Sequence, residues 1–163
     1  QLYQSQKDRS ENVMIVDLVR NDLARSCRAG SVQVNELFGI YQFEQVFQMI
    51  STVSGELLPD VHPVDAIRRA FPMGSMTGAP KVRSMELIEQ YESTKRGLYS
   101  GAVGYFTPQG DFDFNVVIRS ILYNRDERYL SFQAGGAIVF DSVPEAEYEE
   151  SLLKAQGMFR VLT

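Results

Sequence analysis

Short turns between runs of β-compatible residues constrain the fold of this chain more than any other feature. Residues 99–107 and 112–123 are separated by Thr107-Pro108-Gln109-Gly110-Asp111, and residues 124–127 lead into a third run at 128–140. Turns of this kind join antiparallel strands, because parallel strands need a crossover of about a dozen residues or more. The pattern therefore predicts a three-stranded antiparallel meander in the second half of the chain.

Helix patterns flank this block. Residues 1 to about 25 contain good helix formers and neither Gly nor Pro. Ser142-Val143-Pro144-Glu145 resembles a capping box, which predicts a last helix that ends near Leu162.

The region between the first helix and the meander predicts two strands and two shorter helices. An extended segment begins at Val32, and residues 43–55 suit a second strand. Pro63 and Pro80 can each occupy the first turn of a helix, and residues 72–79 between those helices are expected to form a loop. The fold class predicted is α+β, with largely antiparallel sheets packed with helices.

Composition excludes several classes of function. The chain has 163 residues, 44% hydrophobic and 23% charged, which is typical of one soluble globular domain. A net charge of −5 argues against a nucleic-acid partner. No apolar run reaches about 18 residues, so no membrane span is expected. The single cysteine, Cys27, and the lack of a signal peptide indicate a cytoplasmic protein.

Familiar catalytic and nucleotide-binding motifs are missing. The one histidine, His62, gives little support for a Ser-His or Cys-His nucleophile. Residues 74–81 superficially resemble a P-loop, but Pro80 precedes the lysine and Val82 stands where a Ser or Thr would hold Mg²⁺. Any chemistry must therefore use carboxylates, backbone amides and cations.

Paired carboxylates occur in both long helices. Glu147, Glu150 and Lys154 are spaced by three and four residues in the last helix, so they share one face. Asp8 and Glu11 are three apart in the first helix, on a face that continues into apolar residues. Two interpretations remain open at this point: solvated flanks with local salt bridges, or an acidic cleft that holds Mg²⁺.

A small-residue loop offers a candidate anion site. Gly74, Gly78 and Ala79 allow a ligand close to the backbone, and the helix after Pro80 favours negative charge at its start. The alternative is an ordinary turn with an N-cap. Arg119, predicted to lie in a strand of apolar residues, would pair with a carboxylate of the protein or of a ligand.

Taken together, the segments resemble the chorismate-utilising enzyme family. The resemblance covers essentially the whole chain, in the family's order. The matching stretches are Lys7-Asp8-Arg9-Ser10-Glu11-Asn12, Val16-Asp17-Leu18-Val19-Arg20-Asn21-Asp22, Pro72 to Arg83, Arg96 to Tyr105, Ile118-Arg119, Gln133 to Gly136, and Asp141 to Lys154.

The resemblance implies a Mg²⁺-dependent site for chorismate, a dicarboxylate. Its metal ligands fall on Glu11, Glu147 and Glu150, with Asp8 close by. It also implies a set of groups that meet the substrate's carboxylates: Tyr99, Arg119, Lys154, the Gly135 backbone, and the amides of Thr77, Gly78 and Ala79.

Within the family, Gly74-Ser75-Met76-Thr77-Gly78 is closer to the aminodeoxychorismate synthase form than to the anthranilate synthase form. The first subfamily aminates chorismate with ammonia from a glutamine amidotransferase subunit, on the way to para-aminobenzoate and folate. Component I of anthranilate synthase, from tryptophan biosynthesis, is the alternative. Gln48 replaces a histidine common in the family, which disfavours elimination of pyruvate, and Ala137 replaces a glycine.

The resemblance assigns no catalytic nucleophile to these residues. The family's Ser-Pro-Glu motif and its Pro-Ile-Lys/Ala-Gly-Thr motif precede the matching region and do not occur in residues 1–163. The chain is therefore expected to be the C-terminal part of a chorismate-binding catalytic domain. A third interpretation is that these residues alone form a binding module without catalytic activity.

Overall fold

The structure is a computed structural model that describes residues 2–43, 47–140 and 142–162. Its backbone contacts separate into two units, Gln1–Tyr91 and Glu92–Thr163. Helices and antiparallel strand pairs occur in both units, which confirms the α+β class predicted from the sequence. In the described ranges, every helix is too short or too polar to cross a lipid bilayer.

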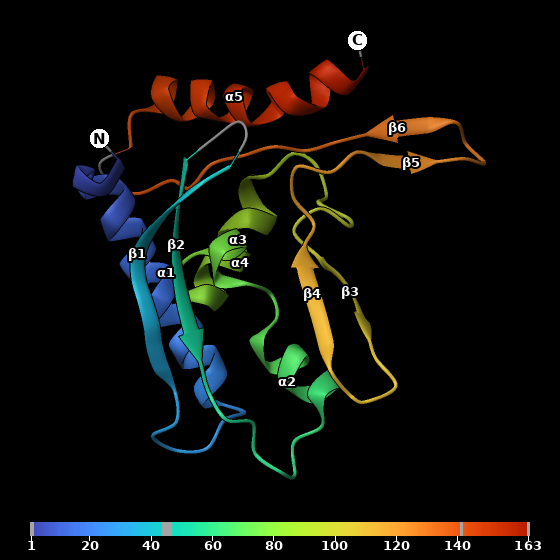
Figure 1. The fold of residues 1–163 in the computed structure, drawn as a ribbon. Helices are drawn as coiled ribbons and strands as arrows, with labels where there is room; N and C mark the ends of the chain where they lie inside the picture. Colours follow the sequence, from blue (N-terminus) through green and yellow to red (C-terminus); the bar gives the residue numbers. More distant parts are fainter. Residues whose placement is uncertain (1, 44–46, 141, 163) are drawn as a thin grey trace. The chain divides into compact units, whose positions relative to one another are not determined.

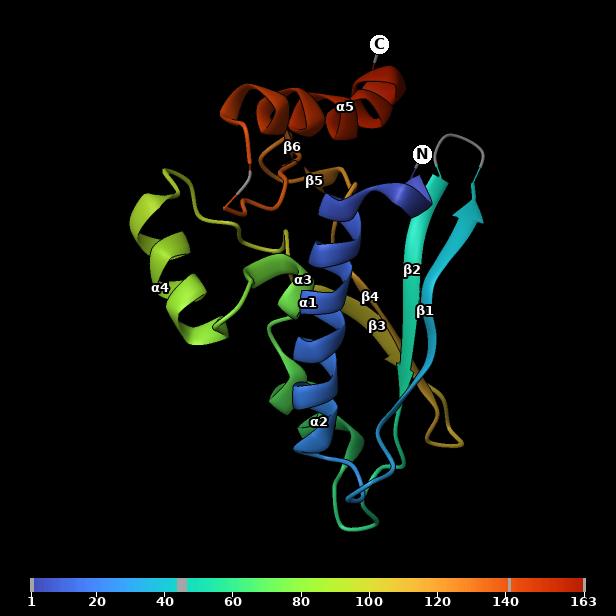
Figure 2. The same ribbon diagram turned by 90° about the vertical axis from the view of Figure 1, so that its left-hand side faces the viewer.

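The first unit is built around helix α1 (Gln6–Ala24), which follows a 3-10 turn, η1 (Leu2–Gln4). Ser5 caps the helix, because its Oγ accepts a hydrogen bond from the Asp8 amide at 3.3 Å. The helix lies alongside the hairpin of β1 (Gln33–Gln42) and β2 (Phe47–Ser54), as Figures 1 and 2 show. The helix and both strands predicted here are confirmed, and residues 44–46 of the second predicted strand lie outside the described ranges.

One side-chain hydroxyl links α1 to an irregular point of this hairpin. The register shifts between Glu36 and Gly39, and Phe38 takes a positive φ of 61°. Ser51 accepts a hydrogen bond from the Phe38 amide at 3.0 Å and donates to Asn12 Oδ1 at 2.5 Å. The bond to Asn12 fixes the hairpin against the helix turn that contains Glu11.

Three helices complete the first unit. The histidine has a structural role at the start of α2 (Pro63–Ala70), because His62 Nδ1 accepts a hydrogen bond from the Val64 amide at 3.2 Å. A one-turn helix, α3 (Gly74–Thr77), interrupts the segment that was expected to be loop, and α4 (Lys81–Tyr91) follows as predicted. The turn forms because the amides of Met76 and Gly78 find carbonyl partners four or fewer residues back.

The second unit contains two hairpins and one long helix. Strands β3 (Ala102–Phe106) and β4 (Phe112–Val116) pair through the predicted turn, which the Thr107 amide closes on the Asp111 carbonyl at 2.7 Å. Strands β5 (Leu122–Asn124) and β6 (Tyr129–Ser131) form the other hairpin, and helix α5 (Pro144–Leu162) ends where predicted.

The predicted three-stranded meander is wrong, because the run at 112–123 breaks after Val116. The Ile118 amide turns back onto the Val116 carbonyl, and Arg119 adopts a left-handed φ of 49°. The chain bends there, so β4 pairs with β3 and β5 pairs with β6 in separate two-stranded sheets. The apolar residues 116–118 favour a strand, but amino-acid composition alone does not predict the bend of the backbone.

The third predicted strand also ends early, at Ser131 rather than near residue 140. Side chains, rather than a neighbouring strand, hold the segment that follows. Phe132 packs edge-on against Phe159 of α5 with ring centroids 5.1 Å apart, and Gln133 donates to the Lys95 carbonyl at 3.2 Å. This segment therefore lies against α5, which matters for the site.

Candidate functional site

Helix α5 presents two carboxylates one turn apart, and they differ in exposure. Glu147 is only 5% exposed and its Oε2 atom is shielded from solvent, whereas the side chain of Glu150 is 41% exposed. The interpretation of this face as a solvated flank is therefore wrong for Glu147. Burial of a carboxylate is costly unless hydrogen bonds or a cation compensate it.

Ser142 holds the side chain of Glu147 in place. Its hydroxyl donates to Glu147 Oε1 at 2.7 Å and accepts from the Val139 amide at 3.0 Å. Ser142 does not form the expected capping box with Glu145. Helix α5 begins at Pro144, and the Ser142 hydroxyl binds the side chain of Glu147 in the next turn instead. The Ser-x-x-Glu pattern had identified the serine but not its partner.

The segment before α5 places Gly135 and Gly136 close to the charged side chains of Glu147 and Lys154. A Cβ atom on Gly136 would lie 3.4 Å from Glu147 Oε2 and 3.9 Å from Lys154 Nζ. Lys154 Nζ lies 2.6 Å from Glu150 Oε1 and 3.4 Å from the Gly135 carbonyl oxygen, to which it donates. The glycines therefore allow the backbone to approach the charged face of α5 closely.

The Tyr99 hydroxyl also lies close to Gly135. A Cβ atom on Gly135 would lie 3.7 Å from the Tyr99 hydroxyl oxygen. Burial raises the pKa of Tyr99, an effect that the charge of Arg96 partly opposes. The hydroxyl is therefore protonated at neutral pH and able to donate a hydrogen bond.

Arg96 fixes the turn that carries Tyr99, a role that sequence reasoning missed. Its guanidinium donates to both carboxylate oxygens of Glu92, at 2.9 and 2.5 Å, and to Ser100 Oγ at 3.2 Å. These hydrogen bonds lower the pKa of Glu92. Ser100 has a positive φ of 69°, so the bond from Arg96 supports a backbone conformation that a serine rarely adopts.

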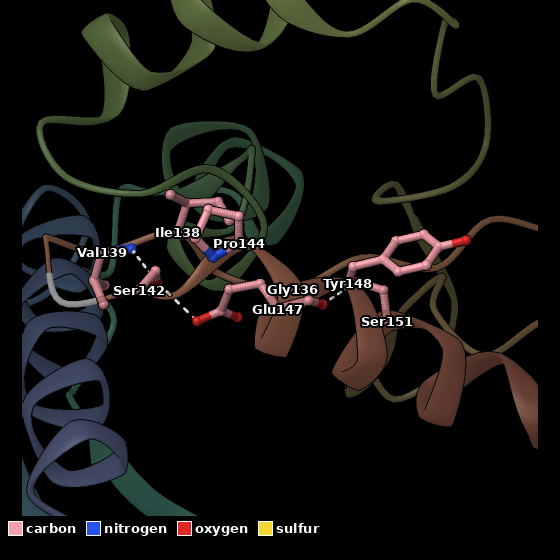
Figure 3. Close-up of a pocket in the computed structure, with 8 residues that line it drawn as sticks. All are labelled: Gly136, Ile138, Val139, Ser142, Pro144, Glu147, Tyr148 and Ser151. Atoms are coloured by element: carbon pink, nitrogen blue, oxygen red, sulfur yellow. Dashed lines mark hydrogen bonds between the residues drawn. The ribbon is translucent and has the colours of Figure 1, made fainter.

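A cavity of about 300 Å³ lies beside the buried carboxylate (Figure 3). Ile138, Val139 and Pro144 supply apolar surface next to Glu147, and the two dashed bonds of Ser142 join the loop to the helix. The other residues that line the cavity are Gly136, Ser142, Tyr148 and Ser151. The second unit thus gathers Tyr99, Gly135, Lys154, Glu147 and Glu150, all predicted from the sequence, in one region.

The first unit carries the remaining predicted residues except Arg119. Glu11 lies on α1, where its Oε1 atom is shielded from solvent, with Lys7 Nζ 3.9 Å away. At the end of α3, the Thr77 hydroxyl donates to the Met73 carbonyl at 3.2 Å, and the amide of Gly78, the next residue, donates to the Gly74 carbonyl at 3.0 Å. Gly78 has a φ of 119°, which requires glycine. In this structure one of the predicted anion donors, the Gly78 amide, is engaged within its own turn.

Arg119 lies outside the expected strand, with its exposed side chain on the bend between β4 and β5. Across the described residues, no cluster of three or more His, Cys, Asp or Glu side chains is arranged to hold a metal ion. The predicted ligands divide between the units, with Glu11 in the first and Glu147 and Glu150 in the second. The three-ligand set therefore stays a prediction.

The chemistry of these groups nevertheless fits Mg²⁺. All three are carboxylates, the hard oxygen ligands that this cation prefers. Glu11 and Glu147 each hold an oxygen atom away from solvent, where the attraction between a carboxylate and a cation is stronger than in water.

Comparison with known proteins tests the resemblance found in the sequence. One protein family, described as chorismate binding enzyme, matches residues 1–160 of the chain. The chain is 51% identical over 157 residues to an aminodeoxychorismate synthase, chloroplastic, of Arabidopsis thaliana, and 48% identical over 162 residues to aminodeoxychorismate synthase component 1 of Bacillus subtilis. It covers 17% and 34% of the length of those two relatives, while they match 96% and 99% of the chain.

A solved structure shares the fold. Anthranilate synthase component I of Streptococcus pneumoniae superposes with a TM-score of 0.82 at 37% sequence identity, over 96% of this chain and 36% of its own. Since the family match spans nearly every residue, and the curated relatives align along the same length, the sequence resemblance is confirmed. The chain belongs to the chorismate-binding enzyme family.

Proposed function

We propose that the chain is part of a Mg²⁺-dependent synthase that aminates chorismate, as aminodeoxychorismate synthase component I. One observation carries the proposal: Tyr99, Gly135 and Lys154 lie together beside the buried Glu147. That arrangement occurs in a chain about half identical to aminodeoxychorismate synthases. It offers a hydroxyl donor, an ammonium group and an acidic site within one region.

The substrate's two carboxylates are assigned to different groups. Lys154 and Arg119 supply positive charge for one of them, and the Tyr99 hydroxyl donates a hydrogen bond. Lys154 already points at the Gly135 carbonyl and Glu150, so a substrate carboxylate would compete for the same ammonium group. The loop of Thr77, Gly78 and Ala79 is assigned to backbone contacts with the substrate.

Glu11, Glu147 and Glu150 are the residues that would hold Mg²⁺. When bound, the ion offsets the charge of a substrate carboxylate and polarises the departing hydroxyl as a Lewis acid. Ser142 orients Glu147 for that role through the 2.7 Å hydrogen bond to Oε1, as groups behind metal ligands commonly do.

The remaining parts of the proposal concern the rest of the enzyme. The chain would form the C-terminal part of a chorismate-binding catalytic domain in a cytoplasmic enzyme, with the nucleophile toward the ring supplied by residues outside 1–163. Ammonia would come from a glutamine amidotransferase partner. Residues 1–163 alone are expected to bind Mg²⁺ or an anion without turning over chorismate.

Anthranilate synthase component I is the second candidate, favoured by the superposition with the Streptococcus pneumoniae enzyme. Gln48 weighs against it. This residue pairs with Tyr41 in the β1–β2 hairpin and stands where the family resemblance expects a histidine. An amide side chain does not transfer protons near neutral pH as an imidazole does.

The test is a product assay on the complete polypeptide that contains this chain, with chorismate, Mg²⁺ and ammonium. Aminodeoxychorismate is the expected product. Anthranilate with pyruvate would transfer the assignment to the second candidate, and isochorismate formed without ammonia would overturn both. Turnover by residues 1–163 alone would refute the assignment of the nucleophile to residues outside them.

A further inference from the structure

A buried ion pair in the first unit has no part in the proposed chemistry. Asp22 Oδ2 near the end of α1 lies 2.6 Å from Lys81 Nζ at the start of α4, and the two side chains are 7% and 15% exposed. Lys81 Nζ also donates to the Ala70 carbonyl at 3.1 Å. A buried charge that loses its partner is strongly unfavourable, so this contact resists displacement.

The lysine closes the segment that contains the candidate anion loop. Ala70 is the last residue of α2 and Lys81 the first of α4, so one ammonium group joins both ends of residues 70–81. Thr77, Gly78 and Ala79 lie between those ends. Lys81 therefore closes the segment through the Ala70 carbonyl and attaches the closed loop to Asp22 of α1.

Helix α1 holds this loop at a second point. A Cβ atom on Gly74 would lie 3.0 Å from Leu18 Cδ1, so the one-turn helix α3 sits directly on the leucine. Leu18 and Asp22 are four residues apart and share one helix face. Two contacts on the same face of α1 thus set the position of the loop.

The same face carries the predicted metal ligand of the first unit. Glu11 precedes Leu18 by seven residues and Asp22 by eleven, spacings that return to nearly the same direction around an α-helix. With a rise of 1.5 Å per residue, Glu11 and Asp22 lie about 16 Å apart along the axis. One rigid helix therefore relates Glu11 to the anchors of the loop.

We propose that Asp22 and Lys81 form a positioning pair, which holds the Thr77–Ala79 loop at a set place relative to Glu11 so that it can receive a substrate carboxylate. Neither residue touches substrate. The identity of the substrate whose carboxylate the loop receives rests on the proposed function. The positioning of the loop by Asp22 and Lys81 does not.

The double variant Asp22→Asn/Lys81→Met tests the pair in the complete polypeptide. It removes both charges together, and such replacements are often neutral for stability. We expect urea unfolding close to wild type, faster amide hydrogen exchange in residues 72–80, and a KM for chorismate raised about tenfold, with kcat changed less than KM. Asp17→Asn is the matched control, because it breaks an exposed pair with Arg20 on the same helix, and all three measurements should stay unchanged.

Wild-type hydrogen exchange and wild-type KM in the double variant would overturn the proposal. If that variant does not fold, Lys81→Arg takes its place, since it keeps the charge and alters the geometry. Absence of chorismate turnover by the wild-type polypeptide would refute the proposed function, and hydrogen exchange in residues 72–80 would then decide on the positioning pair alone.

Discussion

Replacement of Glu147 by Gln should remove the Mg²⁺-dependent part of the protein's stability. The substitution keeps the shape of the side chain and leaves a carbonyl oxygen that can accept the 2.7 Å bond from Ser142. It takes away the charge of a carboxylate that is 5% exposed and replaces one of its two acceptor oxygens with an NH2 group. Because the buried environment is otherwise preserved, we expect the metal-free unfolding free energy to change by no more than about 1 kcal/mol.

The size of the metal effect follows from linkage. An ion that binds only the folded state stabilises it by RT ln(1 + [Mg²⁺]/Kd), which is about 1.4 kcal/mol when Mg²⁺ is at ten times its Kd. For a chain of this size, that amounts to a rise of about 3–6 °C in Tm. The wild-type polypeptide should show this rise, and Glu147→Gln should show little or none of it.

Thermal unfolding with and without Mg²⁺ measures both quantities. Glu149→Gln is the matched control, because it removes the same charge from an exposed position on the same helix and should keep the Mg²⁺ response. An equal response in wild type and Glu147→Gln would refute the assignment of Glu147 as a ligand. So would a wild-type protein that Mg²⁺ does not stabilise.

Further predictions follow from local geometry. In Gly104→Val, the new Cβ would overlap the Asp113 carbonyl oxygen of the paired strand, so urea unfolding should show a loss of about 1–3 kcal/mol; unchanged stability would contradict the β3–β4 register. The hydrogen bond from Arg96 lowers the pKa of Glu92 from its ordinary 4.5. The stability contributed by this pair is therefore present above pH 4.5 and lost as the pH falls through the lowered value. Glu92→Gln should flatten that part of the stability-against-pH curve, and an identical curve would show that the pair contributes nothing. Burial raises the pKa of Cys27, which is 7% exposed, so alkylation of the native protein should be slow at neutral pH and fast after unfolding; rapid native labelling would place the thiol at the surface.

Local patterns predicted the elements whose ends depend on neighbouring residues. Pro63 and Pro80 located the starts of α2 and α4, because the fixed φ of proline suits the first turn of a helix. The turn at 107–111 predicted a hairpin, and the structure contains it. The run through Val117 and Ile118 was misread, since its bend depends on a bond between the Ser100 amide and the Val117 carbonyl, seventeen residues apart.

The candidate site was likewise predicted only in part from the sequence. Spacing placed Glu147, Glu150 and Lys154 on one helix face, and the motifs indicated the family. Spacing could not tell which carboxylate is buried, because both occupy the same face. Ser142 and Gly136, which precede the helix, settle that question because they lie against Glu147, whereas Glu150 stays half exposed.

The amino-acid sequence by itself determined the residue chemistry, the helix faces and the family, because these depend on side-chain type and on periods of a few residues. Only the tertiary structure decided which groups meet. Asp22 and Lys81 are 59 residues apart, and no periodic pattern connects them. Their pairing depends on where α1 and α4 come to lie, and burial then makes the separation of the two charges costly.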